Sequence, residues 1–164
     1  TGKMFAFEHY GIVPDILTLA KSFGGGMPLG AFISSPEIMK SLSFNPVLGH
    51  ITTFGGHPVC CAAAIANLDI IIKDKLYEEA TQKGKLFKKY LSHPSIKSVR
   101  QIGLFIAVEF ADFNTNKKII DQCIKNGLIA DWFLFSPQCM RIAPPLIITE
   151  EEIKTACDII LSSI

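Results

Sequence analysis

The chain has 164 residues, the length of about one domain. Hydrophobic residues make up 49% and charged residues 19%, which excludes intrinsic disorder and predicts that other protein covers much of the surface. The formal net charge of +1 gives no electrostatic footprint for nucleic acid or for an anionic membrane. We therefore expect a globular domain that binds neither.

The five cysteines are odd in number and include no C-x-x-C spacing. This pattern argues against a disulfide framework and against a zinc site, so we expect small buried hydrophobes, no metal, and a reducing compartment, the cytoplasm. No apolar run approaches the ~20 residues that span a bilayer. The chain starts without Met and without a targeting signal, which predicts that it begins inside a domain.

Two short apolar runs flank a glycine-rich turn near the start of the chain. They span residues 16–21 and 29–34, and residues 24–26 between them are all glycine. Short apolar runs around a glycine turn are typical of strands in a buried sheet. A helix is then predicted to start at Pro36, because proline is favoured in the first turn of a helix.

The next predicted elements are two helices. Residues 58–72 are rich in Ala and Ile and carry no charge before Asp69, a pattern typical of a buried helix rather than a surface one. From Lys73 to Tyr90 the pattern becomes amphipathic, which predicts a second helix or a bent continuation of the first. The pair His93-Pro94 ends it.

The sequence pattern after Pro94 predicts a small α+β unit. Strands are predicted at residues 96–100, 104–110, 128–130 and 140–143, and a helix at 116–126 that ends at Gly127. Thr149 and Glu152 have the spacing of a capping box, which predicts a C-terminal helix to Ile164.

Lys21 is the first candidate functional residue, because it ends an apolar run and precedes the three glycines. Desolvation at a rigid strand end lowers the pKa of an amine and frees it for nucleophilic attack. The glycines allow a ligand to approach the backbone closely. The alternative is a strand-end lysine that simply extends into solvent. The turn is not a phosphate-binding P-loop, because no G-K-[ST] follows it.

A second candidate is the loop that precedes the predicted helix at Pro58. It contains Thr52 and Thr53, followed by Gly55 and Gly56. Free N–H groups and the dipole at a helix N-terminus favour an anion, and hydroxyls just before it can add hydrogen bonds to phosphate oxygens. The alternative is ordinary loop and capping chemistry.

Arg141 is the third candidate, an arginine in an apolar strand before two prolines. An unpaired buried charge is costly, so this guanidinium needs a partner, and its planar fork suits a carboxylate. That partner is either a ligand or an internal carboxylate such as Glu109.

Together these stretches resemble the class III aminotransferases, which are fold-type I enzymes dependent on pyridoxal 5′-phosphate. The similarity extends from Thr1 to about Ile164 and is strongest in residues 1–9, 14–31, 53–64 and 141–152. Several separate motifs match in order and spacing.

The resemblance implies an α/β fold in which this chain supplies part of the mainly parallel sheet of a large domain and a smaller C-terminal α+β domain. Residues 1–65 are then the C-terminal part of the large, cofactor-binding domain. Residues 66–90 are connecting helices, and residues 91–164 form the small domain.

The resemblance also implies roles for the candidate residues. Lys21 matches the lysine that forms a Schiff base with the cofactor. Thr53, with Thr52 beside it, matches the threonine that binds the cofactor phosphate across the dimer interface, and Arg141 matches the arginine that binds the substrate carboxylate. His57 stands where the family usually has asparagine, and we interpret it as a variant helix cap.

Gly103 and Glu109 fall in a family stretch of the small domain, and we interpret both as structural. The implied reaction is ping-pong transfer of an amino group from an amino acid or ω-amino donor to a keto acid, in a homodimer with shared active sites. A same-family aminomutase or decarboxylase is an alternative, and so is a non-catalytic truncated remnant that acts as an interaction module. Bound cofactor is yellow, so absorbance separates the enzymes from the remnant.

Members of the family are much longer than this chain, and the family residues that cradle the cofactor precede the position of Thr1. A truncated gene product, a cleaved or split enzyme, and a piece of a longer chain are three open explanations. In each case we expect this chain alone to be inactive. We also expect residues 1–65 to be poorly stable alone, since parallel sheets are normally covered on both faces.

Overall fold

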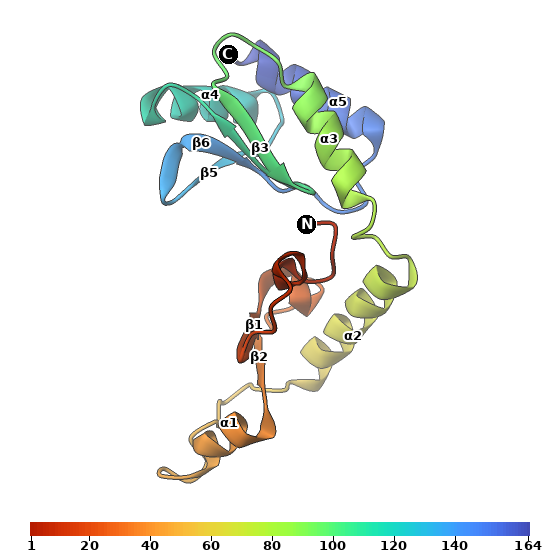
Figure 1. The fold of residues 1–164 in the computed structure, drawn as a ribbon, viewed down its shortest axis with the longest axis vertical. Helices are drawn as coiled ribbons and strands as arrows, with labels where there is room; N and C mark the ends of the chain where they lie inside the picture. Colours follow the sequence, from red (N-terminus) through yellow and green to blue (C-terminus); the bar gives the residue numbers. More distant parts are fainter. The chain divides into compact units, whose positions relative to one another are not determined.

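The computed structural model describes residues 1–164, which form two compact units (Figure 1). The N-terminal unit comprises Phe7–Lys75, and the C-terminal unit comprises Thr1–Ala6 together with Leu76–Ile164. This division differs from the expected boundaries at residues 65 and 90, because one predicted connecting helix packs within each unit. None of the helices combines the length and the apolar character that crossing a membrane requires.

The N-terminal unit contains short elements and one long helix. They are 3₁₀ turn η1 (Ala6–Tyr10, whose first residue belongs to the other unit), strand β1 (Ile16–Leu19), 3₁₀ turn η2 (Lys21–Gly24), strand β2 (Ala31–Ser34), helix α1 (Pro36–Lys40), 3₁₀ turn η3 (Ser41–Ser43) and helix α2 (Pro58–Lys73). The predicted start at Pro36 is confirmed, and the Ser35 hydroxyl caps α1 by accepting a hydrogen bond from the Ile38 N–H at 3.4 Å.

Strands β1 and β2 pair antiparallel, with Ile16 opposite Ser34 and Leu19 opposite Ala31. The connection between them, residues 20–30, has no α-helical crossover of the kind that a parallel pair needs. The expected parallel pairing is therefore not formed by strands within this chain. The two expected strands are both present, but each is shorter than its apolar run.

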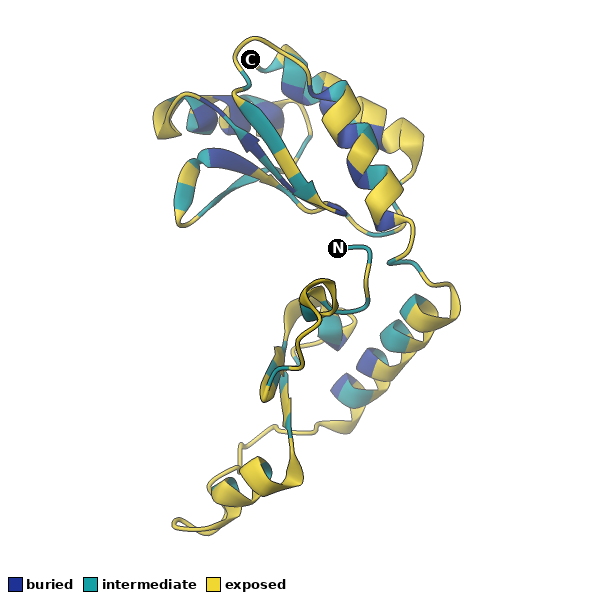
Figure 2. Ribbon diagram, viewed as in Figure 1, coloured by how far each residue is buried: buried dark blue, intermediate teal, exposed yellow.

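Helix α2 begins at Pro58, as predicted, and His57 caps it. The His57 Nδ1 accepts a hydrogen bond from the Val59 N–H at 3.3 Å, which confirms the interpretation of this histidine as a variant cap. The helix was expected to be buried, yet within this chain only Cys60 and Ala64 are (Figure 2). Apolar side chains such as Ile65, 60% exposed, remain open to solvent.

The C-terminal unit is a four-stranded antiparallel sheet packed against three helices. Its elements are α3 (Ala80–Tyr90), β3 (Ser98–Ile102), β4 (Phe105–Glu109), α4 (Phe113–Lys125), β5 (Asp131–Phe133), β6 (Ser136–Ile142) and α5 (Glu150–Ser162), and the strand order is β3-β4-β6-β5. Apolar residues from all three helices join the core, including Phe87, Ile120 and Ile153, which are each at most 1% exposed. The expected small α+β unit is therefore present.

Several element boundaries in this unit differ from the predicted ones for local reasons. Helix α4 begins before residue 116, because the Asp112 carboxylate caps it by accepting a hydrogen bond from the Thr115 N–H at 2.8 Å. Helix α3 begins only at Ala80, because turns interrupt the preceding residues and Lys75 adopts a left-handed backbone with φ 48°. The strand expected at residues 128–130 forms three residues later, as β5 at Asp131–Phe133.

The sheet register decides which side chains meet the helices. Val108 lies opposite Met140, and both are fully buried on the face that the helices cover. Ala107 lies opposite Arg141, on the other face of the same strands. Arg141 is therefore excluded from the core by strand alternation, even though its neighbours in sequence are apolar.

Gly103 and Glu109 both make contacts that maintain the fold, in agreement with their structural interpretation. Gly103 turns between β3 and β4 with φ 58°, and a Cβ there would lie 2.8 Å from the Thr1 Cα. The Glu109 carboxylate accepts hydrogen bonds from the Ser98 hydroxyl at 2.8 Å and from the Arg100 guanidinium at 2.6 Å. The Ser98 hydroxyl, followed by Arg100, holds the pKa of Glu109 below its ordinary value.

Candidate functional site

Lys21 lies one residue beyond strand β1, after Ala20, and opens the turn η2 with a left-handed backbone, φ 57°. A non-glycine residue in this conformation costs about 1–2 kcal/mol, and such strain is concentrated at functional sites. The Lys21 ammonium is exposed and makes no ion pair or hydrogen bond within the chain. The desolvation expected at this lysine is therefore not supplied by these residues, but its amine is free for a ligand.

The turn that follows Lys21 is held by backbone hydrogen bonds and close packing. The Phe23 N–H donates to the Ala20 carbonyl at 3.2 Å, and the Gly25 N–H donates to the Ser22 carbonyl at 3.1 Å. Gly25 has φ 59°, and a Cβ there would lie 2.5 Å from the Ala63 carbonyl oxygen of α2. Only glycine fits that position, so the glycine-rich turn serves packing against α2.

Helix α2 also contributes a side chain that the sequence reasoning missed. The Asn67 Nδ2 donates a hydrogen bond to the Ser22 carbonyl at 2.8 Å, across 45 residues of sequence. The signal was present, because Asn67 is the only side-chain amide in the helix and the residues before it, from Pro58 on, carry no charge. An isolated amide in such a run needs a hydrogen-bond partner, and the partner here is the residue next to Lys21.

Thr52 and Thr53 lie in the turn before α2, and both are exposed. Neither hydroxyl makes a hydrogen bond within the chain, so both are available to a ligand. The turn is closed by the Gly55 N–H, which donates to the Thr52 carbonyl at 3.4 Å. A Cβ at Gly55 would meet the Thr52 hydroxyl oxygen, so a larger residue there would require this exposed hydroxyl to rotate away.

The helix start offers an anion fewer N–H groups than expected. Pro58 has no N–H, and the Val59 N–H is taken by His57. The Cys61 N–H donates to the His57 carbonyl at 3.0 Å. Any phosphate bound here would therefore depend on the threonine hydroxyls more than on the helix N-terminus.

Arg141 lies on β6, and its guanidinium donates through Nη2 to the carboxylate of Asp131 on β5. The expected internal alternative was a pair with Glu109, which instead binds Arg100. The internal partner of Arg141 is therefore Asp131 and not Glu109. Its side chain is 43% exposed, and no other donor of the guanidinium makes a hydrogen bond within the chain.

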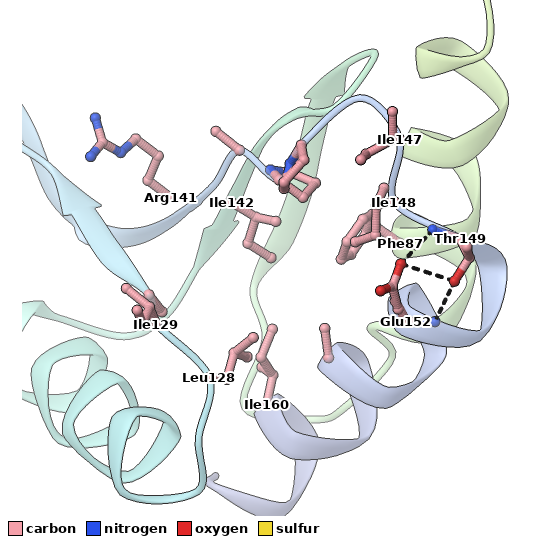
Figure 3. A pocket seen from close by; sticks show the side chains of 15 residues that line it. Phe87, Leu128, Ile129, Arg141, Ile142, Ile147, Ile148, Thr149, Glu152 and Ile160 are labelled. Atoms are coloured by element: carbon pink, nitrogen blue, oxygen red, sulfur yellow. Dashed lines mark hydrogen bonds between the residues drawn. The ribbon is translucent and has the colours of Figure 1, made fainter. Parts of the chain in front are cut away.

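Arg141 also lies at the edge of a pocket of about 660 Å³ in the C-terminal unit (Figure 3). The lining is mainly apolar and includes Phe87, Leu128, Ile142 and Ile160. In the close view the Arg141 side chain extends away from Ile142 and from the apolar interior of the pocket. The pocket therefore has a cation at its edge.

The other polar side chains of this pocket are already satisfied. The Glu152 carboxylate accepts hydrogen bonds from the Thr149 N–H at 2.8 Å and from its hydroxyl at 3.0 Å (Figure 3). The Glu152 N–H in turn donates to that hydroxyl at 3.2 Å, which completes the predicted capping box. These two residues hold the helix start, so Arg141, which is bound only through Nη2, is the polar side chain of the pocket that keeps unused donors.

The candidate residues are divided between the two units. Lys21, Thr52 and Thr53 lie in the N-terminal unit, and Arg141 lies in the C-terminal unit. In the N-terminal unit the free side chains are a primary amine and two hydroxyls, which suit an aldehyde and a phosphate, and in the C-terminal unit the ion-paired guanidinium of Arg141 keeps unused donors that suit a carboxylate. The residues present therefore fit pyridoxal 5′-phosphate.

Comparison with known proteins places the chain in a family. The family described as aminotransferase class-III matches residues 1–164. This chain is a class-III aminotransferase sequence. It is 41% identical over 165 residues to the acetylornithine aminotransferase of Caldanaerobacter subterraneus and 43% identical over 161 residues to that of Methanocaldococcus jannaschii. These matches cover 98% and 93% of the chain but 40% and 38% of the relatives, so it spans about 40% of their length.

Solved structures of the same family share the fold. An aminotransferase from Bacillus anthracis has a TM-score of 0.89 at 30% identity, covering 99% of this chain and 41% of that one. An ornithine aminotransferase from Toxoplasma gondii, in which PLP partially occupies the active site, has a TM-score of 0.85 at 33% identity and covers 99% and 39%. The expected α/β class of fold-type I transaminases is confirmed.

Proposed function

We propose that the protein to which this chain belongs transfers an amino group from an amino acid or ω-amino donor to a keto acid, with pyridoxal 5′-phosphate as cofactor. Membership of the class-III aminotransferase family supports the reaction class. The observation that carries the proposal is Lys21, whose exposed, unpartnered amine stands on a strained backbone between β1 and the glycine turn.

Lys21 has two tasks in this reaction. Its Nζ would hold the cofactor covalently while no substrate is bound, and it would be a free amine once a substrate is bound. When bound, the cofactor supplies an electron sink for the negative charge that develops on the substrate. The freed Lys21 Nζ then takes a proton from the substrate carbon as general base and returns it as general acid.

Arg141 binds the carboxylate of the substrate in this proposal. Its Nη2 is held by Asp131, and its remaining donors are free for a second carboxylate. A guanidinium with one anchored nitrogen presents the others in a fixed plane, which suits planar carboxylate recognition. Asp131 also partly neutralises the charge, so it tunes how strongly a carboxylate binds.

Thr53, with Thr52, binds the cofactor phosphate of a neighbouring subunit, and the protein is a homodimer with shared active sites. The free hydroxyls of both threonines support phosphate binding. The exposed apolar side chains of α2 and its preceding loop support the homodimer, because Phe54 is 79% and Val59 56% exposed. A second copy would cover these side chains.

The protein belongs in a reducing compartment, the cytoplasm, in this proposal. All five cysteines are free thiols, and four of them are buried. Buried unpaired thiols are compatible with a compartment that does not form disulfides.

The test is reduction of the native protein with borohydride in the presence of pyridoxal 5′-phosphate, followed by peptide mass analysis. The proposal expects a stable increment of one reduced cofactor on the peptide that contains Lys21, together with amino transfer between an amino acid and a keto acid before reduction. A native protein that binds no cofactor at Lys21 and transfers no amino group would contradict it.

A further inference from the structure

The turn that carries Lys21 is too short to maintain its own geometry. Residue Lys21 has φ 57°, and η2 ends after three more residues at Gly24. A left-handed lysine persists only where surrounding structure determines its conformation. Helix α2 supplies that support.

The support consists of two contacts from neighbouring turns of α2. The Ser22 carbonyl accepts one hydrogen bond from the Gly25 N–H at 3.1 Å within the turn and a second from the Asn67 amide at 2.8 Å. Gly25 packs so closely against the Ala63 carbonyl that no side chain fits between them. Ala63 and Asn67 are one helical turn apart, so both contacts lie on the same face of α2.

The contact requires a hydrogen-bond donor at residue 67, which the side-chain amide supplies. An apolar side chain would leave the Ser22 carbonyl without its second hydrogen bond. A carboxylate would place a negative charge against the carbonyl oxygen. The Ser22 carbonyl belongs to the peptide between Ser22 and Phe23, one residue beyond Lys21, so this contact restrains the turn in which the lysine side chain starts.

We propose that Asn67 is a positioning residue for Lys21: its hydrogen bond to the Ser22 carbonyl fixes the left-handed turn that aims the Lys21 amine at the cofactor aldehyde. This inference rests on the proposed function, because it assumes that Lys21 binds the cofactor. Asn67 does not touch the reacting atoms in this assignment. It acts through the backbone of the residue next to Lys21.

The experiment measures how fast the cofactor-free native protein recombines with pyridoxal 5′-phosphate, by visible absorbance and by the borohydride-trapped mass on Lys21. Asn67→Leu and Asn67→Asp both remove the donor and should slow recombination by about 10- to 100-fold, because a misplacement of reacting groups by about 1 Å can cost up to about 100-fold in rate. Both should also shift the pH midpoint of the visible band by about half a unit, since the environment of the lysine nitrogen changes.

Two matched variants distinguish positioning from simple stabilisation. Asn67→Gln keeps an amide donor and should recombine within about twofold of the native rate, as expected when the functional group is retained. Asp69→Asn changes an exposed side chain of the same helix that makes no hydrogen bond within the chain, and it should change neither readout. Thermal unfolding midpoints identify which Asn67 variants remain folded, and one folded donor-free variant suffices for the comparison.

The outcomes separate this inference from the proposed function. Folded Asn67→Leu or Asn67→Asp protein with native recombination and a native pH midpoint would overturn the positioning role while Lys21 is still labelled. Equal slowing in Asn67→Gln would also overturn it, because the amide would then be irrelevant. A native protein that gives no borohydride-stable label on Lys21 would instead contradict the proposed function.

Discussion

Arg141 and Asp131 lie directly opposite each other on strands β6 and β5 and form an ion pair across the sheet. Their side chains are 43% and 51% exposed. Exposed ion pairs contribute about 0.2–1 kcal/mol to stability, so the pair contributes little to folding. An arginine held at a pocket edge by a weak structural contact is suited to exchanging part of its interactions with a ligand.

Replacing Arg141 with alanine should therefore impair substrate binding more than folding. Loss of a charged hydrogen-bonded partner should cost about 2–5 kcal/mol in carboxylate binding, seen as a higher KM in steady-state kinetics. The unfolding free energy should change by less than about 1 kcal/mol. Cofactor content, measured by absorbance, should not change.

Asp131→Asn is the matched control for that experiment. It keeps an oxygen beside the guanidinium but removes the competing negative charge, so the KM for carboxylate substrates should stay the same or fall. For an amine donor without a carboxylate, Arg141→Ala and Asp131→Asn should both have the same KM as the native protein. An unchanged KM for every carboxylate substrate in Arg141→Ala would show that this arginine is structural.

The strained backbone of Lys21 gives a second prediction, which separates catalysis from stability. Lys21→Gly should abolish turnover and yet exceed Lys21→Ala in stability by about 1 kcal/mol, because glycine adopts a left-handed backbone without steric cost. Chemical unfolding of the two variants measures the difference, and both should lack amino transfer. Equal stability of the two would show that the turn relaxes, and turnover in either would remove Lys21 from the reaction.

The sequence predicted those parts of the fold that local signals determine. Proline at a helix start, the Thr149 and Glu152 spacing, and the apolar runs around the glycines each act within a few residues, and each corresponds to an observed element. The boundary of α4 shifted because Asp112 caps a helix that begins at Phe113, three residues before the predicted start at residue 116. The boundary of β5 shifted because Asp131 pairs with Arg141 across the sheet.

The long-range parts of the candidate site could not be read from the sequence in the same way. Arg141 was correctly expected to need a carboxylate, but the choice of Asp131 over Glu109 depends on register across the sheet. The contact from Asn67 to Ser22 depends on how α2 packs against the turn. Both contacts result from tertiary packing, and the spacing of residues in a single sequence does not predict which partners tertiary packing brings together.

A third prediction concerns the acid sensitivity of the C-terminal helix. The Thr149 N–H, followed by the Thr149 hydroxyl, holds the pKa of Glu152 below its ordinary value. A carboxyl with a lowered folded pKa stabilises the fold above its unfolded pKa, and this contribution is lost as pH falls through the folded value. Glu152→Gln should therefore be less stable than the native protein at neutral pH.

The difference between the two proteins should disappear in acid, below the folded pKa of Glu152, where the native carboxyl is also protonated. Urea unfolding of both proteins across this pH range measures it. Glu151→Gln is the matched control, because the carboxyl of Glu151 is next to Glu152 in the sequence but is exposed and lies outside the capping box. A stability difference that stays constant with pH would show that the charge of Glu152 is not involved.

The last prediction concerns Thr53 and the shared active site. Because Pro58 has no N–H and His57 occupies the Val59 N–H, the helix start leaves little for a phosphate beyond the threonine hydroxyls. Thr53→Val removes one hydroxyl at nearly constant shape, so it should weaken cofactor binding by roughly 1–3 kcal/mol, whereas Thr53→Ser should not. If the phosphate is held across the interface, cofactor should also tighten the native dimer, since a ligand that binds only the assembled state stabilises it. Sedimentation with and without cofactor measures this coupling, and a monomer that binds cofactor with native affinity would refute both the shared site and the dimer.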